Sequence, residues 1–194
     1  MRKLIYLVAV TLDGFIAGPD AQADFFGFDG DSAAAVLADW PETMPTHLRG
    51  PLGLEGVANR RFDTVVMGRG TYEPAMAVGI TSPYRHMEQF VFSRTLADLD
   101  PGVTFVGGDT DPAAFVHDLK RRDGLDIWLC GGGQLAAQLV DEIDELVLKV
   151  NPMVIGAGVP LFAGPFRPTP FRRADTRTFD TGVSIVTYER VEAA

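Results

Sequence analysis

The feature that most constrains the fold of this chain is residues 126–136, where an apolar segment runs into three consecutive glycines and then into a segment rich in Ala and Leu. This order predicts a strand that turns directly into a helix. Glycines at such a corner let the backbone approach a ligand closely, and N–H groups at the start of a helix favour an anion. Gly131, Gly133 and Ala136 also satisfy the dinucleotide-binding pattern G-x-G-x-x-[GA], a weak signal alone. The corner therefore predicts a phosphate site, with a tight turn that binds no ligand as the alternative.

Strand-like and helix-like segments alternate along most of the chain. Apolar runs predict strands over residues 2–10, 62–67, 89–92, 103–106, 126–130 and 144–150, followed by a final pair over 171–178 and 182–190. Helical patterns cover residues 31–40, 112–122 and 133–140, with Asp31 or Ser32 as the N-cap of the first helix and Asp111 as that of the second. This alternation predicts an α/β fold whose sheet contains parallel strands.

We expect one domain over residues 1–194, because no change of composition divides the chain. The pattern is weakest from residue 41 to 61, where prolines and glycines interrupt it and at most one short helix is expected, near residues 46–52. We therefore interpret residues 29–61 as an irregular insertion. Its irregular part serves either as a lid over a site or as an arm that packs against a neighbouring subunit.

The composition argues against several kinds of partner. The formal net charge of −9 leaves no basic surface for nucleic acid or an anionic membrane. No apolar run approaches the roughly 20 residues of a membrane span, and the apolar start lacks a signal-peptide cleavage site, so we expect a cytoplasmic protein. Cys130 is the only cysteine, and we interpret it as a small buried hydrophobe, with a catalytic thiol as the alternative. The three histidines lack ligand-like spacing, so no metal site is expected.

Two arginines follow predicted strands directly, and each lies close to a hydroxyl. Arg69 is near Thr71, and Arg94 follows Ser93. In open α/β sheets ligands collect beyond the carboxyl ends of the strands, so these groups and the glycine corner are expected to share one site. Guanidinium groups with nearby hydroxyls suit a phosphate monoester. The alternative is that each arginine makes an exposed ion pair with a surface carboxylate.

Four motifs in this order resemble the dihydrofolate-reductase-like superfamily. They are residues 9–18 (AVTLDGFIAG), residues 66–73 (VMGRGTYE), Ser93-Arg94, and residues 130–135 (CGGGQL). The resemblance is closest to the reductase domain that ends the bifunctional riboflavin-biosynthesis deaminase-reductase, and it covers almost the whole chain. It implies a three-layer fold with a mixed, mostly parallel sheet flanked by helices, the cofactor NADPH, a small-molecule substrate and a homodimer.

The resemblance also implies roles for individual residues of the four motifs. The nicotinamide would contact the backbone of Ala9 and Ile16. The phosphate region would be held by Gly68, Arg69 and Thr71, and the adenosine 2′-phosphate by Ser93 and Arg94. The pyrophosphate would lie on the backbone of Gly131, Gly132, Gly133, Gln134 and Leu135. The candidate catalytic carboxylates are Asp13, which lies in the first motif, and Asp39, which lies on a predicted helix.

These expectations together indicate an NADPH-dependent reductase that transfers a hydride to a heterocyclic or ribosylamino-pyrimidine substrate, like the 5-amino-6-(5-phosphoribosylamino)uracil reductases. One alternative is a dihydrofolate reductase. Another, from a different class, is a non-catalytic nucleotide-binding protein that keeps the reductase fold, because fold alone does not fix function.

Overall fold

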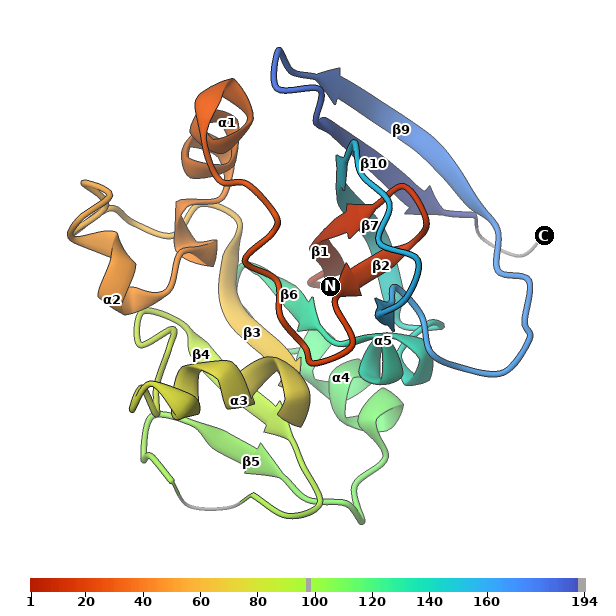
Figure 1. Cartoon of the computed structure of the whole chain (residues 1–194). Helices are drawn as coiled ribbons and strands as arrows, with labels where there is room; N and C mark the ends of the chain where they lie inside the picture. The colour runs from red at the N-terminus through yellow and green to blue at the C-terminus, as the bar shows by residue number, and fades with distance from the viewer. Residues whose placement is uncertain (97–98, 192–194) are drawn as a thin grey trace.

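The structure is a computed structural model that describes residues 1–96 and 99–191. Its main sheet contains strands β1 (Leu4–Thr11), β3 (Phe62–Gly68), β4 (Glu88–Phe92), β5 (Thr104–Val106), β6 (Asp126–Gly131), β7 (Ile143–Asn151), β9 (Phe171–Thr178) and β10 (Ser184–Arg190). They lie in the order β5-β4-β3-β6-β1-β7-β10-β9 (Figure 1). Pairing is parallel from β5 to β7 and antiparallel from β7 to β9. The mixed, mostly parallel α/β sheet is thereby confirmed.

Helices cover both faces of the sheet and give the molecule three layers (Figure 1). They are α1 (Gly30–Asp39), α2 (Thr46–Arg49), α3 (Arg69–Ala77), α4 (Pro112–Lys120) and α5 (Gly133–Gln138), with a 3-10 turn, η1, at Pro41–Thr43. Alternate residues of β1 enter two separate cores, Leu4 and Tyr6 on the side of α4 and α5, and Ile5 on the side of α1 and α3. Burial on both faces explains why the parallel strands are continuous apolar runs rather than alternating ones. No helix within the described ranges has the length and apolar character needed to cross a bilayer.

Local capping confirms one predicted helix start and corrects another. The carboxylate of Asp111 accepts hydrogen bonds from the N–H groups of Ala113 and Ala114 at 3.3 Å, as expected of the N-cap of α4. The first helix begins at Gly30, so Asp29 occupies the N-cap position that we predicted for Asp31 or Ser32. Asp31 instead accepts a hydrogen bond from the N–H of Asp180 at 2.8 Å. The side chain of Asp31 therefore binds a distant segment of the chain instead of capping α1.

Two short strands were not predicted. β2 (Phe15–Ala17) and β8 (Val159–Pro160) pair in a separate two-stranded antiparallel sheet. The approach is close enough to require a glycine, because a Cβ at Gly158 would lie 2.1 Å from the carbonyl oxygen of Ala17. Strands of three and two residues are too short to show a period in sequence.

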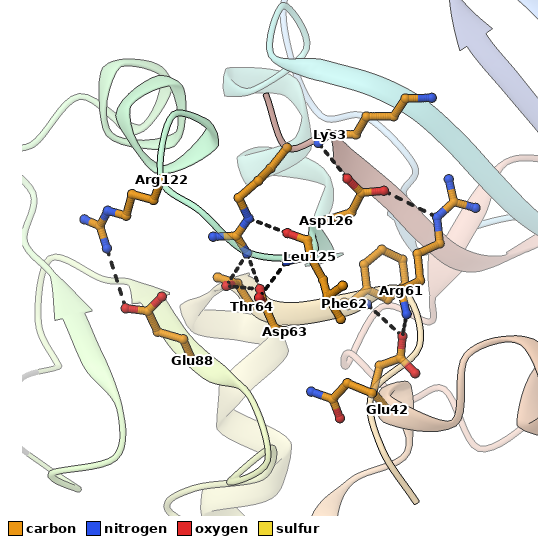
Figure 2. A network of polar contacts seen from close by, with 12 residues as sticks. Lys3, Glu42, Arg61, Phe62, Asp63, Thr64, Glu88, Arg122, Leu125 and Asp126 are labelled. Carbon is orange, nitrogen blue, oxygen red and sulfur yellow. Dashed lines mark hydrogen bonds and ion pairs between the residues drawn. The ribbon is translucent and has the colours of Figure 1, made fainter.

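The irregular insertion is fastened to the sheet by a buried carboxylate. Glu42 is fully buried and accepts hydrogen bonds from the backbone N–H groups of Arg60, Arg61 and Phe62 at 3.2, 2.8 and 2.8 Å. Figure 2 shows this carboxylate directed at the start of β3. Arg49, also buried, donates to the carbonyl groups of Pro41 and Val57. These bonds join the two ends of residues 41–61 to each other and to the start of β3.

Charged side chains at the amino edge of the parallel strands neutralise one another. Arg2 pairs with Asp63, and Arg61 pairs with Glu145 at 2.9 Å and with Asp126 at 3.6 Å. Figure 2 shows Arg61, Asp63 and Asp126 within this network. The network fastens the starts of β1, β3 and β6 together at the edge opposite to the one where α/β proteins bind ligands.

We predict that Glu42→Gln lowers the free energy of unfolding by about 1.5–3 kcal/mol, because a buried charged acceptor is lost and an amide N–H group is placed against backbone donors. Urea denaturation followed by circular dichroism measures the change. Glu55→Gln, at an exposed position of the same insertion, is the matched control and should change stability by less than about 0.5 kcal/mol. Equal effects of the two substitutions would contradict the fastening role of Glu42.

Candidate functional site

A cleft with a volume of about 1110 Å³ lies over the carboxyl ends of the parallel strands. Its lining comes from the ends of five adjacent strands: Val106 of β5, Phe92 of β4, Gly68 of β3, Cys130 of β6 and Val8 of β1. With neighbouring strands about 4.8 Å apart, four strand spacings give the cleft a length of roughly 19 Å. It can therefore hold an extended ligand lying across the sheet.

The glycine corner forms the middle of the cleft. Gly131 has φ of +139°, a backbone conformation that other residues rarely adopt. A Cβ at Gly133 would lie 2.1 Å from the carbonyl oxygen of Pro160, so this glycine is required for the packing of β8. A Cβ at Gly132 would meet only the hydroxyl of Thr71, at 3.6 Å, and a Cβ at Gly68 would lie 3.7 Å from the backbone of Gly131. The turns after β3 and β6 therefore touch, and together they line this part of the cleft with backbone.

The two arginines of the cleft are in different states. Arg69 donates to Glu73 at 2.6 Å and to the hydroxyl of Thr95 at 3.1 Å, which is the ion-pair alternative considered above. Arg94 has no carboxylate within ion-pair distance among the described residues. Its stem passes over Gly108, where a Cβ would lie 2.7 Å from Cγ of Arg94. Among the described contacts no ion pair occupies the guanidinium of Arg94, which is therefore available to bind an anion.

The hydroxyl of Ser93 shapes the turn that carries Arg94. Its oxygen accepts hydrogen bonds from the N–H groups of Thr95 at 3.1 Å and Leu96 at 2.9 Å. A hydroxyl that accepts in this way keeps its own hydrogen for donation. Ser93 thus orders the turn and still offers a donor to a ligand.

The other end of the cleft is apolar. Val8, Ile16 and Ala17 line it from β1 and β2, and Val159 and Pro160 line it from β8. β2 and β8 form a flap along this end, held by hydrogen bonds from Leu161 N–H to the Gly14 carbonyl and from Ala163 N–H to the Gly133 carbonyl.

Cys130 lies at the same end and is only partly exposed. Burial raises the pKa of its thiol to about 12. The thiolate is the reactive form of cysteine, so this environment favours the interpretation of Cys130 as a hydrophobe.

The structure brings most of the predicted cofactor residues together. Ten of the twelve line the cleft, namely Ile16, Gly68, Arg69, Thr71, Ser93, Arg94, Gly132, Gly133, Gln134 and Leu135. Ala9 and Gly131 are not among the lining residues. Sequence reasoning did not assign Gly107, Gly108 and Thr110 after β5, although the glycine pair that ends this strand is visible in the sequence.

The two candidate carboxylates lie elsewhere. Asp13 accepts hydrogen bonds from the hydroxyl of Thr11 at 2.5 Å and from the N–H groups of Gly156 and Ile155 at 2.7 and 3.0 Å. These bonds, that from Thr11 above all, hold the pKa of Asp13 below its usual value. Asp39 pairs with Arg177 of β9. Neither carboxylate is among the residues that line the cleft.

Comparison with known sequences identifies the family. A sequence model of the RibD C-terminal domain matches residues 2–185, nearly the full length. The chain belongs to the RibD C-terminal domain family. The expected resemblance is thereby confirmed at the level of the family and its dihydrofolate-reductase-like fold.

Three proteins illustrate how the RibD C-terminal domain of this chain relates to others. The uncharacterized protein YwjB of Bacillus subtilis is 31% identical over 190 residues, which are 95% of this chain and 96% of YwjB. The deaminase/5-amino-6-(5-phosphoribosylamino)uracil reductase of Thermotoga maritima superimposes with a TM-score of 0.67 at 14% identity, over 98% of this chain and 57% of that protein. Dihydrofolate reductase from Enterococcus faecalis, solved with NADP(H), gives a TM-score of 0.63 at 13% identity, over 98% and 97% of the two chains. At 14% and 13% identity, these two structures show that their fold is shared with this chain.

We predict that Cys130 reacts slowly with iodoacetamide in the native protein. With a pKa of about 12 rather than 9.0, the thiolate fraction at pH 8 falls from about one tenth to about one ten-thousandth. Alkylation followed by mass spectrometry should therefore be at least about a hundredfold slower in buffer than in 8 M urea, and no other cysteine complicates the measurement. Rapid alkylation of the native protein would instead support the alternative that Cys130 is a catalytic thiol.

Proposed function

We propose that this member of the RibD C-terminal domain family is an NADPH-dependent reductase. The observation that carries the proposal is the sequence of chemical environments along the 1110 Å³ cleft. Arg94 and Ser93 lie at one end, backbone glycines lie in the middle, and apolar side chains lie at the other end. This order matches a dinucleotide that carries a 2′-phosphate at one end, a pyrophosphate in the middle and an uncharged nicotinamide ring at the other.

The residues present fit the cofactor at each of these three places. The guanidinium of Arg94 and the hydroxyl of Ser93 would hold the 2′-phosphate. The backbone of Gly132, Gly133 and Gly68 would face the pyrophosphate, because at these positions no side chain intervenes. The relatives support the fit: the Enterococcus reductase was solved with NADP(H), and the Thermotoga protein is named as a reductase.

When bound, NADPH supplies a hydride to an electrophilic carbon of the substrate. The residues of the chain would bind the cofactor and orient it. Ile16, Ala17 and Val159 of the flap would cover the nicotinamide and exclude water from the reacting atoms. Val8 of β1 would lie beneath them in the floor of the cleft. The protein thus contributes position and a dry environment, and the cofactor contributes the redox chemistry.

One observation favours the alternative of a nucleotide-binding protein without turnover. Among the described lining residues the only carboxylate is that of Glu73, which pairs with Arg69 away from the apolar end. Within the described chain, therefore, no carboxylate lines the apolar end of the cleft. NADPH consumption with a panel of pteridines, pyrimidines and dihydrofolate separates a reductase from a binding protein.

We predict that NADPH binds about ten- to a hundredfold more tightly than NADH, because a charged hydrogen-bond partner of the 2′-phosphate contributes about 1.5–3 kcal/mol. Arg94→Gln should remove this preference and leave NADH affinity unchanged. Titration calorimetry measures both dissociation constants. Arg167→Gln, which breaks an exposed pair with Asp141 outside the cleft, is the control and should keep the preference. Equal affinities of the wild type for the two nucleotides would reject the proposed 2′-phosphate site.

We also propose a homodimer that covers the segment after β7. Leu161 and Phe162 of this segment pack against the chain's own core, whereas Val154 and Phe166 are 68% and 97% exposed. Exposed apolar side chains of this size are typical of an interface. Light scattering should give twice the 21.0 kDa chain mass, and Phe166→Ser should shift the protein toward the monomer. A wild-type mass of 21.0 kDa would contradict the proposal.

A further inference from the structure

Charge is distributed unevenly along the cleft. Its charged lining residues are Arg69, Glu73 and Arg94, and all three come from the turns and helix that follow β3 and β4. The end formed by β1, β2 and β8 is lined by uncharged residues, namely Val8, Ile16, Ala17, Cys130, Val159 and Pro160. If the phosphates of the cofactor occupy the arginine end and the glycines, the substrate meets the uncharged end.

The segment that borders the uncharged end is strongly acidic. Residues 4–48 contain no Lys or Arg and seven carboxylates, which are Asp13, Asp20, Asp24, Asp29, Asp31, Asp39 and Glu42. Within this segment the loop between β2 and α1 reaches the cleft through Ala21 and Ala23. Asp20 and Asp24 flank these two alanines, and both are exposed. An anionic group on a substrate would therefore enter past like charges.

The cations that lie near this segment already have partners. The Nζ group of Lys149 donates to the carbonyl of Gly27 at 2.7 Å and lies 5.9 Å from the centre of the Phe28 ring. Burial lowers the pKa of Lys149 below its usual value. Arg177 pairs with Asp39. A phosphate at the uncharged end would have to displace one of these contacts.

We infer that the substrate reduced in this cleft is an uncharged, planar ring compound that carries neither phosphate nor carboxylate. This inference rests on the proposed reductase function and narrows its substrate. In the reduction, the ring carbon of a C=N bond gains a hydride from NADPH, and the nitrogen gains a proton from a water molecule at the mouth of the cleft, which leaves NADP⁺ and hydroxide as the other products. Planar uncharged rings suit a place beside the nicotinamide at this end of the cleft, where Val8, Ile16 and Val159 make the surroundings apolar.

The inference excludes two anionic compounds as substrates of this chain. The compound 5-amino-6-(5-phosphoribosylamino)uracil, which appears in the name of the Thermotoga protein, carries a phosphate. Dihydrofolate carries the carboxylates of its glutamate. Each would place negative charge beside Asp20 or Asp24, whereas the phosphate-free pyrimidine and a pterin without a glutamate tail would not.

The test compares a matched pair of ligands in the presence of saturating NADP⁺. The pair is 5-amino-6-(5-phosphoribosylamino)uracil and the same compound without its phosphate, and titration calorimetry gives both dissociation constants. We expect the wild type to bind the phosphate-free compound at least about tenfold more tightly. Ala23→Arg, at an exposed position in the cleft mouth, should strengthen binding of the phosphate ester by about tenfold or more. Ala34→Arg, which adds the same charge on an exposed position of α1 outside the cleft, should leave the ratio unchanged.

Two outcomes would overturn the inference. The first is that the wild type binds the phosphate ester as tightly as the phosphate-free compound; loss of that binding in Lys149→Met would then identify Lys149 as the phosphate partner. The second is that no uncharged ring binds, tested with the phosphate-free pyrimidine, 6-methyl-dihydropterin and a benzoquinone. NADPH titration of the wild type is read separately: its failure would reject the reductase function, whereas the ligand pair reports the charge preference of the cleft.

Discussion

The structure depends above all on parallel pairing around β1, which lies between β6 and β7 and is buried on both faces. Parallel pairing brings the carboxyl ends of five strands to one edge of the sheet, so the turns after them form one continuous cleft. The same constraint collects the amino ends at the opposite edge, where Arg2, Arg61 and their carboxylate partners neutralise one another. The two edges of one sheet thus differ: one lines the cleft, and the other holds the starts of the strands together.

The three glycines after β6 do different things, although the sequence presents them as a single run. Gly131 provides a backbone conformation that side-chain-bearing residues avoid, and Gly133 makes room for the carbonyl of Pro160. Gly132 faces the cleft beside Thr71 with no close neighbour. Gly133 therefore serves the packing of β8 as well as the lining of the cleft, whereas Gly132 serves the cleft alone. The flap at the apolar end therefore packs against the same corner that faces the proposed pyrophosphate.

The sequence predicts the sheet well because its strands are long apolar runs, and predicts the cleft well because strand ends carry their polar groups locally. Prediction failed where a contact joins segments far apart in the chain. β2 exists because Ala17 meets the backbone near Gly158, and no local pattern encodes that meeting. Asp13 is held by Gly156, 143 residues away, and Asp39 by Arg177, 138 residues away, so neither side-chain direction could be read from its neighbours. Ala9 was assigned to the cofactor through its backbone, and its neighbour Val8 is the residue of β1 that lines the cleft.

The central position of β1 has a consequence for synthesis of the chain. Leu4 pairs with Ile127 on one side and with Ile143 on the other, so β1 finds its neighbours only after more than 120 further residues have been made. Until then its apolar residues have no sheet to join. Nascent chains shorter than about 150 residues should therefore depend on chaperones, and native structure should form in one late step rather than progressively from the N-terminus.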